Sequence, residues 1–309
     1  QASGSAAGEL SPFSRVPIPD PFFSFCVDGL RLHHELAPVL VEESGVDYKF
    51  TNTPILHPAF TPEEVQYLKT MMALQSQAGM KVTWLDRQDL RTLQTPLSEA
   101  VLGASCSEGE AQVESYPFTL ALAQAAERYG ATFISGEVVG LERRGERVEG
   151  VRTASGSLLS SGAVVIATGP WSRFASDWIG LRIPVEPMRG QIVHLRWQGP
   201  LPSHSIFHTI GYLLPKPSGV VYLGTTEEMV GFVKSPTPEG AASIMQAGLR
   251  LAPGVESAQV VTVTACLRPV SEDERPIIGS VPRWNGLYLA TGHGRKGILT
   301  SLNTGKYLA

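Results

Sequence analysis

The segment 163–169, Ala-Val-Val-Ile-Ala-Thr-Gly, limits the possible folds of this chain more than any other. A continuous apolar run that ends at a glycine is typical of a strand buried on both faces of a parallel sheet. An amphipathic helix precedes it, from Pro117 to Gly130. Between the helix and the apolar run lie four short strand-like segments joined by glycine-containing turns, at 132–135, 138–143, 147–153 and 157–160. This order predicts an α/β domain of the nucleotide-binding kind.

The rest of the chain divides into a helical part and a strand-rich part. Apolar spacing predicts helices at 28–43 and 61–79, with a strand-like alternation at 48–57 between them. Residues 183–264 are richer in strand patterns, and these lie at 191–197, 211–214 and 220–225, with one helix at 239–250. We therefore expect a second, β-rich domain.

Composition excludes several classes of partner. The chain of 309 residues has a net charge of -4 and no block of Lys or Arg, so neither nucleic acid nor an anionic membrane surface is expected to bind it. No apolar run reaches the roughly 18 residues of a membrane span. Its 3 cysteines, an odd number without short spacing, predict neither a disulfide framework nor a metal site. We expect a cytoplasmic protein with a small-molecule substrate.

The segment 292–297 matches the pattern G-x-G-x-x-G and follows the strand-like run 287–291. A dinucleotide fingerprint needs an acidic residue about 20 positions further on. Here the chain ends within that distance and no Asp or Glu follows. A glycine-rich turn that opens a helix still directs backbone N–H groups toward an anion, for example a reduced flavin. An ordinary tight turn with close helix packing is the alternative.

Several segments together are similar to one family of flavoproteins. Leu-Arg-Pro at 267–269, Pro-Ile-Ile-Gly at 276–279 and Gly-Leu-Tyr-Leu-Ala-Thr-Gly-His-Gly-Arg-Lys-Gly-Ile at 286–298 resemble the C-terminal part of the D-amino-acid oxidase superfamily, especially its glycine oxidase-like members. Ser-Ala-Ala-Gly at 5–8, Ala-Thr-Gly-Pro-Trp-Ser at 167–172 and Met-Arg-Gly-Gln at 188–191 resemble further segments of these proteins.

The resemblance implies an α/β fold with a discontinuous, Rossmann-like FAD-binding domain and an inserted antiparallel β-rich substrate domain of α+β character. We assign residues 1–45, 115–181 and 265–309 to the first domain, and residues 46–114 and 182–264 to the second. In such enzymes a strand, a G-x-G-x-x-G turn and a helix bind the FAD pyrophosphate. We find no such unit in this sequence, so we expect the domain to be truncated at its N-terminus, with the unit upstream of Gln1.

The resemblance also implies the cofactor contacts. FAD is expected to be bound by Ser5, Ala6, Ala7, Gly8, Val138, Thr168, Gly169, Trp171, Gly292, His293, Gly294, Arg295, Lys296, Gly297 and Ile298. Cys266 aligns with the cysteine that holds flavin covalently in monomeric sarcosine oxidases. Most relatives lack that bond, and a buried cysteine is commonly a small hydrophobic residue. We therefore expect FAD to be bound without a covalent link.

Three residues are implied to act on the substrate. Arg268 would pair with a substrate carboxylate, because its planar guanidinium offers two parallel charge-assisted hydrogen bonds. Tyr212 would donate its hydroxyl to the same carboxylate, and Arg295 would meet substrate or cofactor. The alternatives are a surface ion pair for Arg268 and a place in a strand core for Tyr212. Two further residues bear on specificity: Ile210 would make the pocket more apolar, and Glu227 would either attract the amine or lie in a solvated turn.

The implied reaction is oxidative deamination of glycine, sarcosine or a small D-amino acid by hydride transfer from the α-carbon to flavin N5. Water hydrolyses the resulting imine, and oxygen is the expected acceptor, giving peroxide. Glycine oxidation in thiamine biosynthesis is one setting. Two alternatives stay open: a D-amino-acid dehydrogenase that uses a quinone or an electron-transfer protein, and a catalytically silent fragment that lacks the pyrophosphate site. A homo-oligomer is compatible with the main interpretation and with both alternatives.

Overall fold

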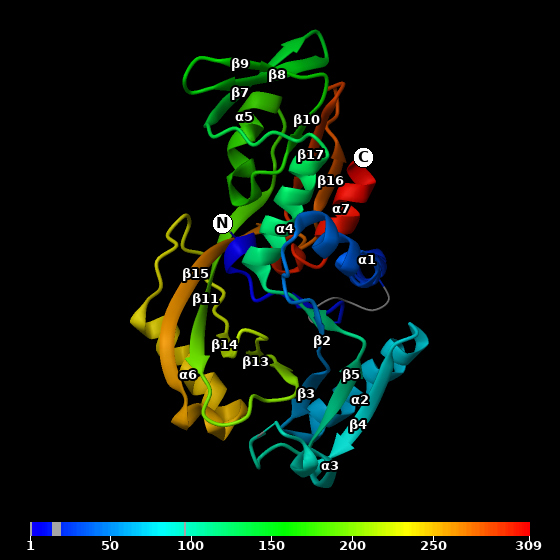
Figure 1. Ribbon diagram of the computed structural model, residues 1–309, viewed down its shortest axis with the longest axis vertical. Helices are drawn as coiled ribbons and strands as arrows, with labels where there is room; N and C mark the ends of the chain where they lie inside the picture. Colours follow the sequence, from blue (N-terminus) through cyan, green and yellow to red (C-terminus); the bar gives the residue numbers. More distant parts are fainter. Residues whose placement is uncertain (1, 14–19, 96) are drawn as a thin grey trace.

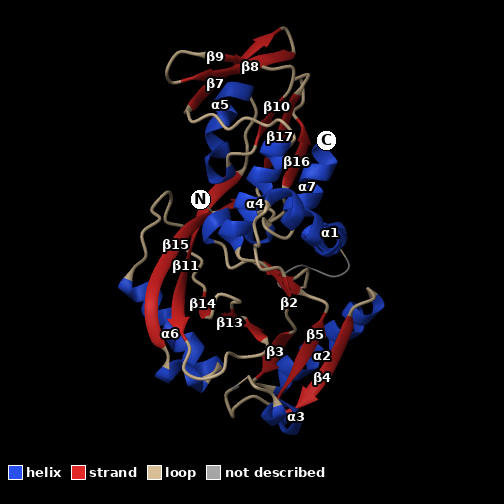
Figure 2. Ribbon diagram, viewed as in Figure 1, coloured by secondary structure: helices blue, strands red, loops and turns tan. Residues whose placement is uncertain are grey.

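The computed structural model describes residues 2–13, 20–95 and 97–309. It is elongated, with small sheets in its upper part and a large curved sheet in its lower part (Figures 1 and 2). The helices are α1 (Pro21–Ser44), α2 (Pro62–Gln77), α3 (Arg87–Thr92), α4 (Ser115–Arg128), α5 (Ser176–Ile179), α6 (Pro238–Leu251) and α7 (Ser301–Leu308).

The large sheet has eight strands in the order β15-β11-β14-β13-β12-β3-β5-β4. Their bounds are β3 (Ile55–Ala59), β4 (Lys81–Asp86), β5 (Gly103–Glu108), β11 (Val185–Arg196), β12 (Ser205–His208), β13 (Gly211–Pro215), β14 (Val220–Gly224) and β15 (Gln259–Ser271). Neighbours are antiparallel except β12 and β3, which pair in parallel. Helix α6 packs on β11, β13 and β14, and α2 packs on β3, β4 and β5. The predicted antiparallel β-rich part is therefore confirmed.

Three small sheets complete the fold. Their orders are β10-β17-β16, β7-β8-β9 and β1-β6-β2. Their bounds are β1 (Glu9–Leu10), β2 (Thr51–Asn52), β6 (Ala111–Gln112), β7 (Val138–Arg144), β8 (Arg147–Thr153), β9 (Leu158–Ser160), β10 (Val164–Ile166), β16 (Ile277–Ser280) and β17 (Leu287–Thr291). Strands β10 and β17 pair in parallel, as the apolar run at 163–169 predicts.

Some local predictions were wrong. Residues 132–135 form no strand, and Phe133 and Ile134 are 63% and 64% exposed, because no described strand pairs with this segment. Strand β10 is not buried on both faces: it is the edge of its sheet, and Val165 is 45% exposed. Helix α1 begins at Pro21, well before residue 28, because the Asp20 carboxylate accepts a hydrogen bond from the backbone N–H of Phe22.

The predicted domain boundary at 264/265 falls inside β15, which runs from one part of the molecule to the other (Figure 1). Both segments assigned to the substrate domain supply strands to the large sheet. The division into two domains stays a prediction.

A hydrophobic core under α1 and α4 joins the two ends of the chain. It includes Leu10 from β1 and Leu299 from the segment after β17, together with Phe23 and Phe118 from the two helices. This packing brings residue 9 and residue 296 to the same region, although 287 positions separate them in the sequence.

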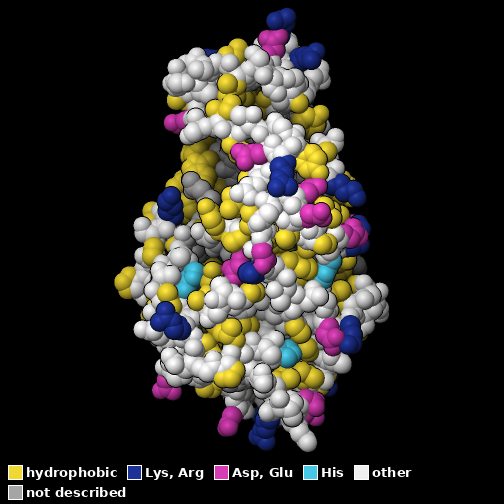
Figure 3. Space-filling model, in the orientation of Figure 1, with side chains coloured by type: hydrophobic (Ala, Val, Ile, Leu, Met, Phe, Trp, Pro, Cys, Tyr) yellow, Lys and Arg dark blue, Asp and Glu magenta, His cyan; other side chains and the backbone are white. Residues whose placement is uncertain are grey.

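The surface view in Figure 3 shows Lys, Arg, Asp and Glu scattered over one face of the molecule. Within the described residues, no helix combines the length and the apolar character that a membrane crossing requires.

Candidate functional site

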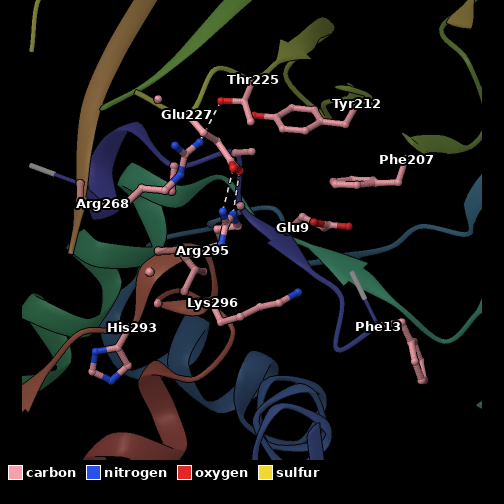
Figure 4. A pocket seen from close by; sticks show the side chains of 18 of the residues that line it. Glu9, Phe13, Phe207, Tyr212, Thr225, Glu227, Arg268, His293, Arg295 and Lys296 are labelled. Carbon is pink, nitrogen blue, oxygen red and sulfur yellow. Dashed lines mark hydrogen bonds and ion pairs between the residues drawn. The ribbon is translucent and has the colours of Figure 1, made fainter. Parts of the chain in front are cut away.

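A cavity of about 630 Å³ lies between the small sheets and the large sheet. One wall is built of small residues, which include Ala6, Ala7, Gly169, Gly294 and Gly297. The opposite walls carry larger side chains from β3, β12, β13, β15 and α2, several of which appear in Figure 4. A volume of this size suits a small-molecule or cofactor site.

Arg268 lies on β15 and points into the cavity (Figure 4). One guanidinium nitrogen donates to the Thr225 hydroxyl at 2.8 Å, and another donates to the Thr226 carbonyl at 3.2 Å. These bonds use two of its five N–H donors and fix the plane of the group. The remaining donors can bind a carboxylate.

The loop that holds Arg268 is itself fixed by Glu228. Its carboxylate accepts hydrogen bonds from Arg189, Thr226 and Gln191, the last at 2.8 Å. The bond from Arg189 does most to lower the pKa of Glu228, to about 2, so the carboxylate is charged at neutral pH. A partly buried ionic network therefore holds the loop that bonds to Arg268.

Two glycines make room for the site. A Cβ on Gly190 would lie 2.1–2.3 Å from the Arg268 guanidinium, and a Cβ on Gly224 would lie 2.3 Å from the Tyr212 ring. Such distances are far shorter than van der Waals contact, so any side chain at either position would displace the functional group beside it. Tyr212 is buried on β13 and stacks on Phe207 with ring centroids 5.1 Å apart. Burial raises the pKa of Tyr212, which keeps its hydroxyl protonated.

Arg295 is held by carboxylates. Its guanidinium donates to both oxygens of Glu227 at 2.7 Å and to Glu274 at 3.0 Å. Glu227 thus pairs with an arginine in this structure, and it lies exposed in an irregular segment, as the solvated-turn interpretation expects. Arg295 lines the cavity, and its part in substrate or cofactor binding stays a prediction.

The turn after β17 differs from the expected helix opening. It leads into the three-residue 3₁₀ helix η4 (Gly294–Lys296), and α7 begins only at Ser301. The dipole of a long helix therefore does not act on an anion at this turn. Lys296 from η4 is buried and donates to the Ser11 carbonyl at 2.7 Å, which ties the turn to the segment after β1.

The cavity brings together most of the predicted site residues. Those that line it are Ser5, Ala6, Ala7, Gly8, Gly169, Tyr212, Arg268, His293, Gly294, Arg295, Lys296, Gly297 and Ile298. Val138, Thr168, Trp171 and Gly292 do not line it, and Val138 lies 39% exposed in β7. Ile210 is also outside the lining and packs on the core beside α6. The roles of all these residues in binding stay predictions.

Three polar residues on the cavity wall were missed from the sequence. Glu9, His57 and Gln75 each have a buried polar atom without a hydrogen-bond partner in the described structure: Glu9 Oε1, His57 Nε2 and Gln75 Oε1. Burial raises the pKa of Glu9 well above its usual range, and Lys296 offsets only part of that effect. Of these three residues, only Glu9 has a local sequence pattern that indicates a site. It is an acidic residue directly after the small-residue segment 5–8.

The wall of small residues fits a flavin ring. A Cβ on Gly169 would meet no atom within 4 Å, and a Cβ on Gly294 would reach only the Pro269 carbonyl at 4.0 Å. The backbone at both positions therefore faces open space, as close approach of a flat ring requires. Cys266 also lines the cavity, but burial raises the pKa of its thiol, which disfavours the nucleophilic thiolate.

Comparisons with known proteins agree with this fit. The family model described as FAD dependent oxidoreductase matches residues 1–309. Hydrogen cyanide synthase subunit HcnC of Pseudomonas aeruginosa is 33% identical over 310 residues, which cover 100% of this chain and 74% of that protein. Glycine oxidase of Bacillus subtilis is 29% identical over 311 residues, covering 100% of this chain and 82% of that protein. The crystal structure of glycine oxidase from Geobacillus kaustophilus matches with a TM-score of 0.93 and 30% identity, covering 99% and 82% of the two chains.

Proposed function

The chain belongs to the FAD-dependent oxidoreductase family, and on this premise we propose that it oxidises the amine of glycine, sarcosine or a small D-amino acid. One observation carries the proposal: the Arg268 guanidinium is fixed in a cavity whose other wall is bare backbone suited to a flavin ring. The similarity to two glycine oxidases supports the same substrate class.

The protein's own part in the reaction is to bind and orient the substrate. Arg268 binds the carboxylate through two parallel hydrogen bonds, which fixes the direction of the α-carbon. The protonated Tyr212 hydroxyl donates to the same group, and Phe207 keeps that hydroxyl in place by stacking on the ring. Ala6, Ala7, Gly169, Gly294 and Gly297 would hold the flavin. Bound FAD supplies the hydride acceptor that amine oxidation needs.

Substrate identity is tested with the yellow holoprotein. We expect peroxide release with at least one of glycine, sarcosine, D-alanine and D-proline. Flavin reduction without peroxide would indicate the dehydrogenase alternative, in which a quinone or an electron-transfer protein accepts the electrons. Absence of flavin reduction with all four compounds would contradict the proposal and favour a catalytically silent chain.

Cyanide formation is a second candidate, because the subunit of hydrogen cyanide synthase named above is similar along this whole chain. A cyanide electrode in the glycine reaction separates the two outcomes. Detection of cyanide in place of glyoxylate would favour the second candidate.

Binding of FAD without a covalent link also belongs to the proposal. All flavin should stay in solution after acid precipitation of the protein, whereas flavin in the pellet would indicate a bond to Cys266. The oxygen acceptor, the cytoplasmic location and the oligomeric state stay predictions.

A further inference from the structure

The Arg295 guanidinium lines the same cavity as that of Arg268, but the partners of the two groups differ in charge. Arg268 donates to a hydroxyl and to a backbone carbonyl, which are both neutral. Arg295 donates with all three of its nitrogens to carboxylates, to both oxygens of Glu227 at 2.7 Å and to Glu274 at 3.0 Å. Of the two arginines, only Arg268 therefore keeps a positive charge that a ligand carboxylate can balance.

One short segment of backbone holds both guanidiniums. Arg268 bonds to Thr225 and Thr226, and the next residue, Glu227, accepts from Arg295. Successive Cα atoms are about 3.8 Å apart, so the partners of the two arginines come from neighbouring positions on the cavity wall. Figure 4 shows Arg268, Glu227 and Arg295 grouped together, with the Glu227 carboxylate directed at the Arg295 guanidinium. The ion pair therefore belongs to the surroundings of any ligand that Arg268 binds.

Glu227 is the partner that occupies Arg295 on the side of the cavity. Its two oxygens each accept one hydrogen bond, which is the strongest arrangement of a carboxylate and a guanidinium. Glu227 lines the cavity with a side chain that is 27% exposed, whereas the Glu274 side chain is 60% exposed and lies outside the lining. The hydrogen bonding with Glu227 also does most to raise the pKa of Arg295 above its usual range.

A ligand with a second carboxylate would be disfavoured beside this pair. Each Arg295 nitrogen already donates to a carboxylate, and the oxygens of Glu227 repel a further anion. A neutral amide of the same shape avoids that repulsion. The arrangement thus favours ligands with one carboxylate, which Arg268 can bind.

We propose that Glu227 is a specificity-determining residue, which occupies Arg295 and so excludes amino acids that carry a second carboxylate. The inference rests on the proposed function for the binding of the substrate carboxylate by Arg268. It narrows the substrate class to amino acids with one carboxylate, so that D-asparagine is preferred over D-aspartate. In a protein without the Glu227 carboxylate, two donors of Arg295 become available to a carboxylate of the ligand.

The test measures binding to the oxidised, flavin-loaded protein and needs no turnover. Malonate, succinate, glutarate and adipate are titrated by calorimetry, because their lengths cover a range of separations between the two arginines. Each compound is compared with its monoamide, in which a neutral amide replaces one carboxylate. We expect every dicarboxylate to bind at least about tenfold more weakly than its monoamide.

Substitution of Glu227 should remove this preference. Glu227→Gln keeps the shape of the side chain and removes its charge, so at least one dicarboxylate should bind within about threefold of its monoamide, or more tightly. Glu227→Ala makes the same test if Glu227→Gln does not fold. Glu272→Gln is the matched control, because Glu272 also pairs with an arginine, Arg182, but is 58% exposed and lies outside the cavity lining. The control should keep the tenfold preference.

A dicarboxylate that binds the unaltered protein as tightly as its monoamide would overturn the inference, and so would a protein that binds neither compound. A preference that persists after substitution of Glu227, or that Glu272→Gln also removes, would overturn it as well. Oxidation of glycine together with any of these results would leave the proposed function intact. A preserved preference in a protein that oxidises none of glycine, sarcosine, D-alanine and D-proline would reject the proposed function alone.

Discussion

The two ends of the cavity differ in how their polar groups are satisfied. At one end Arg268 is held by Thr225 and Thr226 and lies against the bare backbone of Gly190. Elsewhere on the cavity wall, here called the second end, Glu9, His57 and Gln75 present buried atoms that no described residue pairs with. The first end is organised before any ligand binds, whereas the second gains its hydrogen bonds only from a ligand or from water. Substitutions around Arg268 should therefore affect catalysis most.

The largest effect is expected for Arg268→Lys. A lysine offers one point of charge and loses the two parallel hydrogen bonds, so kcat/KM for the amino acid should fall about 10²–10³-fold. The visible spectrum should show that FAD stays bound. Steady-state kinetics check this, with Arg196→Lys as the control because the Arg196 side chain is exposed and bonds to Gln259, away from the cavity. Unchanged kinetics in Arg268→Lys would remove this residue from the site.

A smaller effect is expected for Gly190→Ala. The new Cβ would lie 2.1–2.3 Å from the guanidinium, so Arg268 must leave its position although its charge remains. We expect kcat/KM to fall about 10–100-fold, with some loss of thermal stability because the displaced guanidinium loses its bonds to Thr225 and Thr226. Gly136→Ala is the control, because a Cβ there meets no atom within 4 Å. Equal kinetics in Gly190→Ala and Gly136→Ala would show that the position of the guanidinium does not matter.

The smallest effect concerns pH and the second end of the cavity. Burial, helped by His208 and Lys296, lowers the pKa of His57 to about 4. The unfolded chain takes up a proton near pH 6.5, so the folded protein loses stability as the pH falls from there toward 4. We expect the free energy of unfolding of the unaltered protein, relative to that of His57→Gln, to fall by about 2 kcal/mol between roughly pH 7 and pH 4.5.

Urea unfolding of both proteins at the two pH values measures this difference. At the first end, the pKa of Tyr212 is raised and does not fall in this range, so Tyr212→Phe is the control and should show no such change. A constant difference between the unaltered protein and His57→Gln would mean that His57 is not kept neutral by burial.

The sequence could predict the first end better than the second. The apolar runs at 163–169 and 287–291 indicate neighbouring strands, because parallel strands with helical crossovers read as continuous hydrophobic segments. The parallel pair β10 and β17 confirms this. Arg268 was identified by resemblance to a motif, and its place in the cavity agrees with that prediction.

The second end depends on contacts that no local pattern encodes. Residues 9, 57 and 75 line one cavity because the core under α1 and the pairing of β12 with β3 bring distant segments together. Glu9 follows a small-residue segment, but nothing near it in the sequence indicates that Lys296 and Glu110 lie beside it. The N-terminal turn of α1 does have a local signal, since Asp20-Pro21 is a typical pair at the start of a helix.

We propose that Arg268 fixes an amino-acid carboxylate next to FAD. Anaerobic mixing of the yellow protein with pairs of compounds tests it directly: sarcosine with dimethylamine, D-alanine with ethylamine, and glycine with methylamine. We expect rapid loss of flavin colour with at least one amino acid and none with the matching amine that lacks the carboxylate. Equal bleaching by the amino acid and the plain amine, or bleaching by the amine alone, would contradict it.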